Sequence, residues 1–190
     1  MNNNAITIVS GLPRSGTSMM MQMLAAGGMP ILCDNRRAAD ENNPRGYYEF
    51  ERVKLLKREA SWLPGAKGKA VKIISELLKH LPPDYSYQVI FMQRRLEEIL
   101  ASQREMLIRR GRFAGESGDA GMIELFHQHL TRVEAWLKKQ SSFDLLYVDY
   151  GAIIANPVEQ AKIIARFLGN TMMIEDMADT VDPSLYRQRY

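Results

Sequence analysis

The sequence predicts an α/β fold in which three layers, helix, sheet and helix, are built around a mainly parallel sheet. Three short apolar runs have the length and composition of buried strands, at residues 5–9, 87–92 and 143–148. Each run leads into a stretch whose apolar residues have helical spacing. Strands that alternate with helices are typical of a parallel sheet with both faces covered, so this order of elements predicts the fold class.

Composition limits the kind of protein. The chain has 190 residues, 46% hydrophobic and 25% charged, which suits one domain with one core. The formal net charge of +3 is too small to indicate a nucleic-acid partner, and no apolar run approaches the roughly 20 residues that span a bilayer. The start of the chain lacks a basic targeting region, so we expect a cytoplasmic protein without a membrane span. The single cysteine, Cys33, excludes an intrachain disulfide, and we expect a buried thiol in a reducing compartment.

In the first half of the chain, the sequence predicts some helices and strands clearly and others weakly. After the strand at 5–9, residues 17–26 are apolar on nearly all sides and predict a helix packed on the sheet. Residues 30–33 predict a short strand, and the polar stretch 34–46 predicts a surface loop. Residues 48–62 have helical spacing and precede Pro-Gly, so we expect a helix there. A brief apolar run follows at 70–74.

The second half repeats the pattern of strand and helix. The strand at 87–92 is followed by a predicted helix at 96–109. Four glycines between 111 and 121 predict a flexible loop and a candidate lid. A long amphipathic helix is expected from Met122 to near Gln140, and a last helix at 157–168 follows the third strand.

Residues 11–18, Gly-Leu-Pro-Arg-Ser-Gly-Thr-Ser, have the spacing of the phosphate-binding loop of P-loop NTPases. Gly11 and Gly16 are separated by four residues, and hydroxyl side chains follow Gly16. An ATPase requires lysine directly after the second glycine, whereas here Thr17 takes that place and the cation lies upstream at Arg14. The displaced cation is the main clue to function.

Two enzymatic interpretations compete at this loop. A small-molecule kinase requires Mg²⁺, the loop lysine and a carboxylate at a strand end, for which Asp149 is the candidate, while Arg94 occupies the other strand end. In sulfuryl transfer the migrating group carries less charge, so hydrogen bonds and one or two cations can replace the metal. The groups sufficient for this are the cation and hydroxyls of Arg14, Ser15, Thr17 and Ser18. A non-catalytic nucleotide-binding protein of the same fold is the third possibility.

Three motifs resemble the sulfotransferases that use 3′-phosphoadenosine 5′-phosphosulfate (PAPS). The segment Pro13-Arg14-Ser15-Gly16-Thr17 is similar to their 5′-phosphosulfate loop. Arg94 at a strand end and Ser102 eight residues on resemble the pair that binds the 3′-phosphate. The third similarity is the ending formed by Tyr147-Val148-Asp149-Tyr150, Asn156-Pro157 and Phe167-Leu168-Gly169. Together the motifs cover most of the chain.

The resemblance implies a single sulfotransferase-like domain over residues 1–190 that moves a sulfuryl group from PAPS to a hydroxyl or amine, without a metal. The implied donor site consists of Pro13, Arg14, Ser15, Gly16, Thr17, Ser18, Arg94 and Ser102. The product would be adenosine 3′,5′-bisphosphate. The acceptor stays open among small molecules, carbohydrates, lipids and peptides, and so does the oligomeric state.

The acceptor base has two candidates. Cytosolic members of the family use histidine in a Lys-Thr-His-Leu-Pro stretch, which Lys79-His80-Leu81-Pro82 superficially resembles. His80 precedes Arg94 by only 14 residues, whereas Lys72, at 22 residues, fits that motif's lysine better and leaves Ile74 at the histidine position.

Glu49 resembles the carboxylate base of other branches. The hypothesis is therefore that Glu49 deprotonates the acceptor while Arg14, Lys72 and the loop amides stabilise charge on the sulfuryl group. Two structural alternatives stay open: Glu49 as a first-turn helix residue, and Lys72 as an edge lysine that reaches solvent. Arg187 or Arg189 could close over the donor or belong to a frayed tail.

Overall fold

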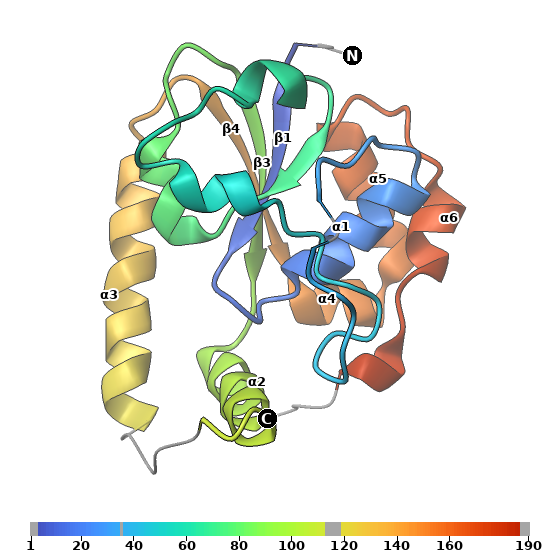
Figure 1. Cartoon of the computed structure of the whole chain (residues 1–190). Coiled ribbons are helices and arrows are strands. Elements are labelled where there is room, and N and C mark those ends of the chain that lie inside the picture. The colour runs from blue at the N-terminus through green and yellow to red at the C-terminus, as the bar shows by residue number, and fades with distance from the viewer. Residues whose placement is uncertain (1–3, 35, 113–118, 187–190) are drawn as a thin grey trace.

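The computed structural model describes residues 4–34, 36–112 and 119–186 (Figure 1). Within these residues, four strands form one sheet in which every neighbouring pair is parallel, in the order β2-β1-β3-β4. The strands are β1 (Ile6–Gly11), β2 (Ala70–Lys72), β3 (Tyr87–Gln93) and β4 (Phe143–Asp149). The predicted α/β class with a parallel sheet is confirmed.

Helices cover both faces of the sheet (Figure 1). One face packs against α1 (Thr17–Ala26), α4 (Tyr150–Ala155), α5 (Pro157–Phe167) and α6 (Ile174–Asp179). The other face packs against α3 (Asp119–Leu137) and the short 3-10 turns η1 (Glu51–Leu55), η2 (Leu63–Ala66) and η3 (Ser75–His80). The alternation of strand side chains explains the two cores, because Ile8 faces one and Val9 the other, both fully buried.

The strand register brings the chemically active ends together. Gly11 pairs with Met92, Val9 with Lys72, and Gln93 with Asp149, so all four strands end near one edge. Helix α2 (Leu96–Arg109) begins at this edge, and a last 3-10 turn, η4 (Pro183–Leu185), ends the described chain. In open parallel sheets this carboxyl edge is where ligands bind.

The helix predicted at 48–62 is wrong. The segment contains the 3-10 turn η1 and further turns, and Tyr48 has a left-handed backbone (φ 52°) that a helix cannot include. Its buried side chains, Val53, Leu56 and Trp62, still pack into the core. The apolar spacing therefore indicated burial correctly but not the backbone conformation.

The strand predicted at 30–33 is also wrong. Only an isolated bridge joins Ile31 to Ala70, because the chain then turns away from β2. There the Asp34 N–H bonds the Glu49 carbonyl, and the Asp34 carboxylate accepts from the Glu51 N–H at 2.7 Å. Cys33 lies at this departure from the sheet, and the residue is only partly buried, whereas a buried thiol was expected.

Other predicted elements can be compared with the described residues. Helix α1 has the predicted bounds, and its Met20, Met21 and Met23 are fully buried. The long helix predicted from Met122 is α3, which begins three residues earlier. Most of the candidate lid at 111–121 lies outside the described residues, as do Arg187 and Arg189. Among the helices that the structure describes, none is long and apolar enough to cross a membrane.

Candidate active site

Residues 11–18, here called the glycine loop, connect β1 to α1 and have the geometry of an anion cradle. Gly11, Arg14 and Gly16 all have positive φ, at 142°, 77° and 100°. Such left-handed residues turn successive N–H groups toward one concave side, and the first-turn N–H groups of α1 have no intrahelical partner. The positive end of the α1 dipole lies at the same place. The loop can therefore hold a negatively charged group with its backbone alone.

Both loop glycines are sterically required. A Cβ on Gly16 would lie 2.4 Å from Cδ2 of Tyr150, and one on Gly11 would lie 2.7 Å from the Met92 carbonyl oxygen. The loop consequently packs tightly on β3 and α4. This contact fixes the height of the loop above the sheet edge.

A cavity of about 310 Å³ opens above the glycine loop. Its walls come from the loop, from the first turns of α1, from α2, and from the polar segment 37–49. Of the residues proposed from the sequence, those that line it are Pro13, Arg14, Gly16, Thr17, Ser18, Glu49, Lys72, Arg94 and Ser102. Residues from five separate segments are thus brought to one place.

Ser15 is placed differently from the other loop residues. Its side chain is fully buried, and its Oγ has no hydrogen-bond partner among the described residues. It borders a separate cavity behind the loop, together with Leu12 and Phe91. The Ser15 hydroxyl therefore lies outside the main cavity, and its N–H is engaged with the Leu12 carbonyl at 3.1 Å.

Arg14 links the glycine loop to α2. Its Nε donates to Ser102 Oγ at 2.9 Å, and its Nη2 donates to the Asn42 carbonyl at 3.1 Å. Burial lowers the pKa of Arg14 from its ordinary value, although a guanidinium stays protonated in proteins. The sequence resemblance pairs Ser102 with Arg94, whereas in the structure the Ser102 hydroxyl contacts Arg14.

Arg94 is held on several sides. Its Nε donates to Glu98 Oε2 at 2.8 Å, and its Nη1 donates to the Arg14 carbonyl at 3.2 Å. The guanidinium carbon lies 4.5 Å from the ring centre of Tyr150 and 5.4 Å from that of Tyr186. A cation fixed in this way presents its charge to the cavity without having to be ordered by a ligand.

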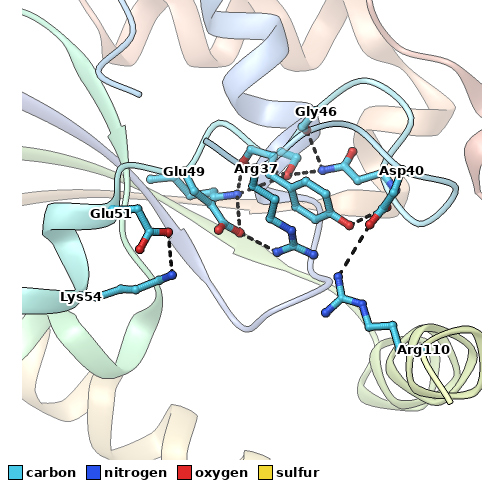
Figure 2. Close-up of polar contacts among 11 residues, drawn as sticks. Arg37, Asp40, Gly46, Glu49, Glu51, Lys54 and Arg110 are labelled. Carbon is cyan, nitrogen blue, oxygen red and sulfur yellow. Dashed lines mark hydrogen bonds and ion pairs between the residues drawn. The ribbon is translucent and has the colours of Figure 1, made fainter. Parts of the chain in front are cut away.

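Glu49 and Lys72 lie close together in the same cavity, and Lys72 Nζ also donates to Ser18 Oγ of the glycine loop at 3.4 Å. Glu49 Oε1 accepts from Arg37 Nη1 at 2.9 Å and lies 3.9 Å from Lys72 Nζ (Figure 2). Lys72 also donates to the Tyr47 carbonyl. Its side chain is only 9% exposed and lines the cavity, so the alternative of an edge lysine reaching solvent does not hold. Glu49 precedes η1, so the alternative of a first-turn helix residue does not hold either.

Burial lowers the pKa of Lys72 to about 8, against the opposing effect of the Glu49 carboxylate, while Arg37 and Arg14 lower it further. Between pH 8 and the ordinary value of 10.5, the unfolded chain binds more protons than the folded chain. The free energy of unfolding should therefore rise with pH across this window.

Replacing Lys72 by methionine should remove this pH dependence and stabilise the protein at pH 7. At roughly 1.4 kcal/mol per pKa unit, the gain has an upper limit of about 3 kcal/mol. Urea unfolding from pH 7 to 10.5 measures it, with Lys139→Met, an exposed lysine after α3, as the control. If the free energy of unfolding of Lys72→Met still rose with pH as in the unmodified protein, Lys72 would not be the group with the lowered pKa.

The structure also places the residues that were weighed against Glu49 and Lys72 or considered as metal ligands. His80, in η3, does not border the cavity, and its Nε2 is buried without a hydrogen-bond partner among the described residues. Ile74 does line the cavity. Asp149 Oδ1 accepts from the Ala152 N–H at 2.8 Å and so caps α4. Among the described residues, no group of three or more His, Cys, Asp or Glu is placed to hold a metal ion.

Sequence reasoning predicted a surface loop at 34–46 but did not identify the individual residues between 37 and 47 that complete the site. Arg37 bonds Glu49, Tyr47 donates to Asp40 Oδ1 at 2.6 Å, and Asp40 lies 3.7 Å from Arg110 on the loop after α2 (Figure 2). Asn43 Nδ2 donates to Ser18 Oγ at 2.9 Å. No spacing rule identifies these residues, because each gains its role from a contact between distant segments.

Comparison with known proteins gives the fold class. No family model and no curated protein matches the sequence. The solved structures that are similar include mouse sulfotransferase SULT7A1 complexed with PAP, with a TM-score of 0.54 and 16% identity over 95% of this chain and 63% of that one. The sulfotransferase domain from the curacin biosynthetic pathway has a TM-score of 0.52 and 12% identity over 96% of this chain and 89% of that domain.

The chain therefore has the fold of the sulfotransferases, as the motif resemblance predicted. It spans less than two thirds of the mouse enzyme.

Proposed function

We propose that the chain is a sulfotransferase of one domain, residues 1–190, that transfers a sulfuryl group from PAPS to a hydroxyl or amine. The observation that carries the proposal is the convergence of Arg14, Arg94 and Ser102 with the glycine loop in one cavity that also contains a carboxylate, Glu49. The shared fold supports it, and one of the similar structures contains PAP.

The donor end is assigned from charge and geometry. The glycine-loop amides and the side chains of Arg14, Thr17 and Ser18 would hold the 5′-phosphosulfate, because left-handed loop residues and a helix N-terminus favour an oxyanion. Arg94 and Ser102 would bind the 3′-phosphate. Pro13, Ser15 and Gly16 shape the loop, since the Ser15 hydroxyl is buried and its N–H bonds the Leu12 carbonyl.

The acceptor end is assigned to Glu49. In the transfer, an acceptor oxygen or nitrogen forms a bond to sulfur as the bond from sulfur to the bridging phosphate oxygen breaks, and the acceptor proton passes to the Glu49 carboxylate. Arg14, Lys72 and the loop amides would stabilise negative charge on the sulfuryl and bridging oxygens. The cations supply this stabilisation by hydrogen bonding and charge, so the proposal requires no metal.

Thermal unfolding with nucleotides tests the donor assignment. Without any metal, adenosine 3′,5′-bisphosphate should raise the free energy of unfolding by about 2.7 kcal/mol at one hundred times its dissociation constant. AMP, which lacks the 3′-phosphate, should shift it less at equal concentration. Arg14→Gln should reduce the shift, and Arg132→Gln, on the exposed side of α3, should retain it.

A shift produced by ATP with Mg²⁺ alone would overturn the proposal in favour of the kinase. Binding of the bisphosphate without sulfuryl transfer to any acceptor tested would instead favour the non-catalytic alternative.

A further inference from the structure

Arg37 is a fixed cation at the acceptor end of the cavity. Its guanidinium carbon lies 3.2 Å from the ring centre of Tyr47, and its Nη1 donates to Glu49 Oε1 at 2.9 Å (Figure 2). The Tyr47 ring is itself held by the hydrogen bond from its hydroxyl to Asp40. Stacking and ion pairing therefore fix the plane of the guanidinium before any ligand binds.

One edge of this guanidinium has no hydrogen-bond partner within the part of the chain that the structure describes. Among the described residues, neither Nε nor Nη2 of Arg37 makes a hydrogen bond, although the side chain is only 32% exposed. These two groups form the parallel pair of N–H donors that matches both oxygens of a carboxylate. A half-buried and oriented pair of donors that no described residue engages indicates a ligand oxoanion.

Arg37 also stands where two cavities meet. Arg37, Tyr47 and Glu49 border both the main cavity and a second, open cavity of about 190 Å³, which residues 37–39 and 46–49 line. Sites that hold a whole ligand typically measure roughly 300–1,000 Å³. The second cavity therefore has room for one end of a ligand whose remainder lies in the main cavity.

We infer that the acceptor carries a carboxylate, which the Nε–Nη2 edge of Arg37 binds while the acceptor hydroxyl or amine lies at Glu49. The inference rests on the proposed function, because it assumes that the acceptor reacts at Glu49. A singly charged planar group fits better than a phosphate, because Glu49 already neutralises part of the Arg37 charge and would repel a dianion. Arg37 would then select the acceptor and orient its nucleophile toward the base.

Matched pairs of acids and amides test the inference. The probes are 4-hydroxyphenylacetate with 4-hydroxyphenylacetamide, and glucuronate with glucuronamide, titrated calorimetrically into the full chain with and without adenosine 3′,5′-bisphosphate. In at least one pair the acid should bind 10- to 100-fold more tightly than its amide, as charge-assisted hydrogen bonds require.

Variants of two adjacent arginines distinguish specific binding of the carboxylate by Arg37 from a general effect of positive charge. Arg37→Gln should abolish the preference for the acid, and Arg37→Lys should retain only part of it, since lysine lacks the paired donors. Arg36→Gln removes the same charge from the neighbouring residue, whose side chain is 75% exposed and borders neither cavity, so it should leave the preference unchanged. Thermal unfolding of each variant verifies that the loop substitution has not unfolded the protein.

Equal binding of acid and amide in both pairs, or a preference that survives in Arg37→Gln, would overturn the inference. Tighter binding of 4-hydroxybenzylphosphonate than of 4-hydroxyphenylacetate would also overturn it, in favour of a phosphate-bearing acceptor. These results are distinct from failure of the proposed function. If adenosine 3′,5′-bisphosphate stabilises the chain and the acid preference is missing, only the acceptor assignment fails; if the acid preference exists and the nucleotide does not bind, only the donor assignment fails.

Discussion

Replacing Glu49 by glutamine is expected to lower sulfuryl transfer by roughly 10²- to 10⁴-fold, the usual contribution of a positioned general base. Glutamine keeps the size of the side chain and can still accept a hydrogen bond from Arg37, but it cannot take the acceptor proton. Stabilisation by adenosine 3′,5′-bisphosphate should persist, because Glu49 is not one of the proposed donor groups. Single-turnover measurement of the transferred sulfuryl group gives the rate.

His80→Ala is the matched control for this prediction. His80 lies in η3 outside the cavity, so its removal should leave turnover unchanged. Normal turnover in Glu49→Gln would contradict the assignment of the base. A loss in His80→Ala with unchanged unfolding would transfer the role to the histidine that the family resemblance first suggests.

The part of the site that the sequence predicts is the part encoded locally. Gly11, Arg14 and Gly16 lie within six residues, and glycine permits the positive φ that Gly11 and Gly16 adopt. The strand β1 and the helix α1 on either side are apolar stretches of the lengths expected for a buried strand and a helix, so their positions could be predicted closely. Arg94 and Ser102 likewise lie on one strand end and one helix.

The part that the sequence does not predict depends on contacts between segments far apart in the chain. Arg14 and Ser102 are 88 residues apart and become hydrogen-bonded only because β1 and β3 are neighbours in the sheet. Arg37 belongs to a polar stretch that resembles any surface loop until Tyr47 and Glu49 are folded onto it. The helix prediction at 48–62 failed for the same reason, since Val53, Leu56 and Trp62 are buried in a core shared with distant segments although the backbone there is not an α-helix.

Replacing Arg94 by methionine should destabilise the protein by about 3–5 kcal/mol, because it leaves a buried carboxylate without its cation. Glu98 is 2% exposed, and its Oε1 accepts a hydrogen bond from the Tyr186 hydroxyl at 2.6 Å. The double variant Arg94→Met/Glu98→Leu should recover most of this loss, since a buried ion pair replaced by apolar side chains is often nearly neutral. The free energies of unfolding in urea of the unmodified protein, the two single variants and the double variant form a double-mutant cycle.

Arg94→Met and the double variant distinguish the contribution of Arg94 to the stability of the protein from its proposed role in binding the nucleotide. Both should lose the stabilisation by adenosine 3′,5′-bisphosphate, so a double variant that is stable but does not bind the nucleotide would assign Arg94 to the donor. Lys79→Met breaks the exposed pair with Glu76, whose atoms lie 2.6 Å apart, and should cost no more than about 1 kcal/mol. An Arg94→Met variant as stable as Lys79→Met would mean that Glu98 does not depend on the cation, and nucleotide binding by the stable double variant would remove Arg94 from the donor site.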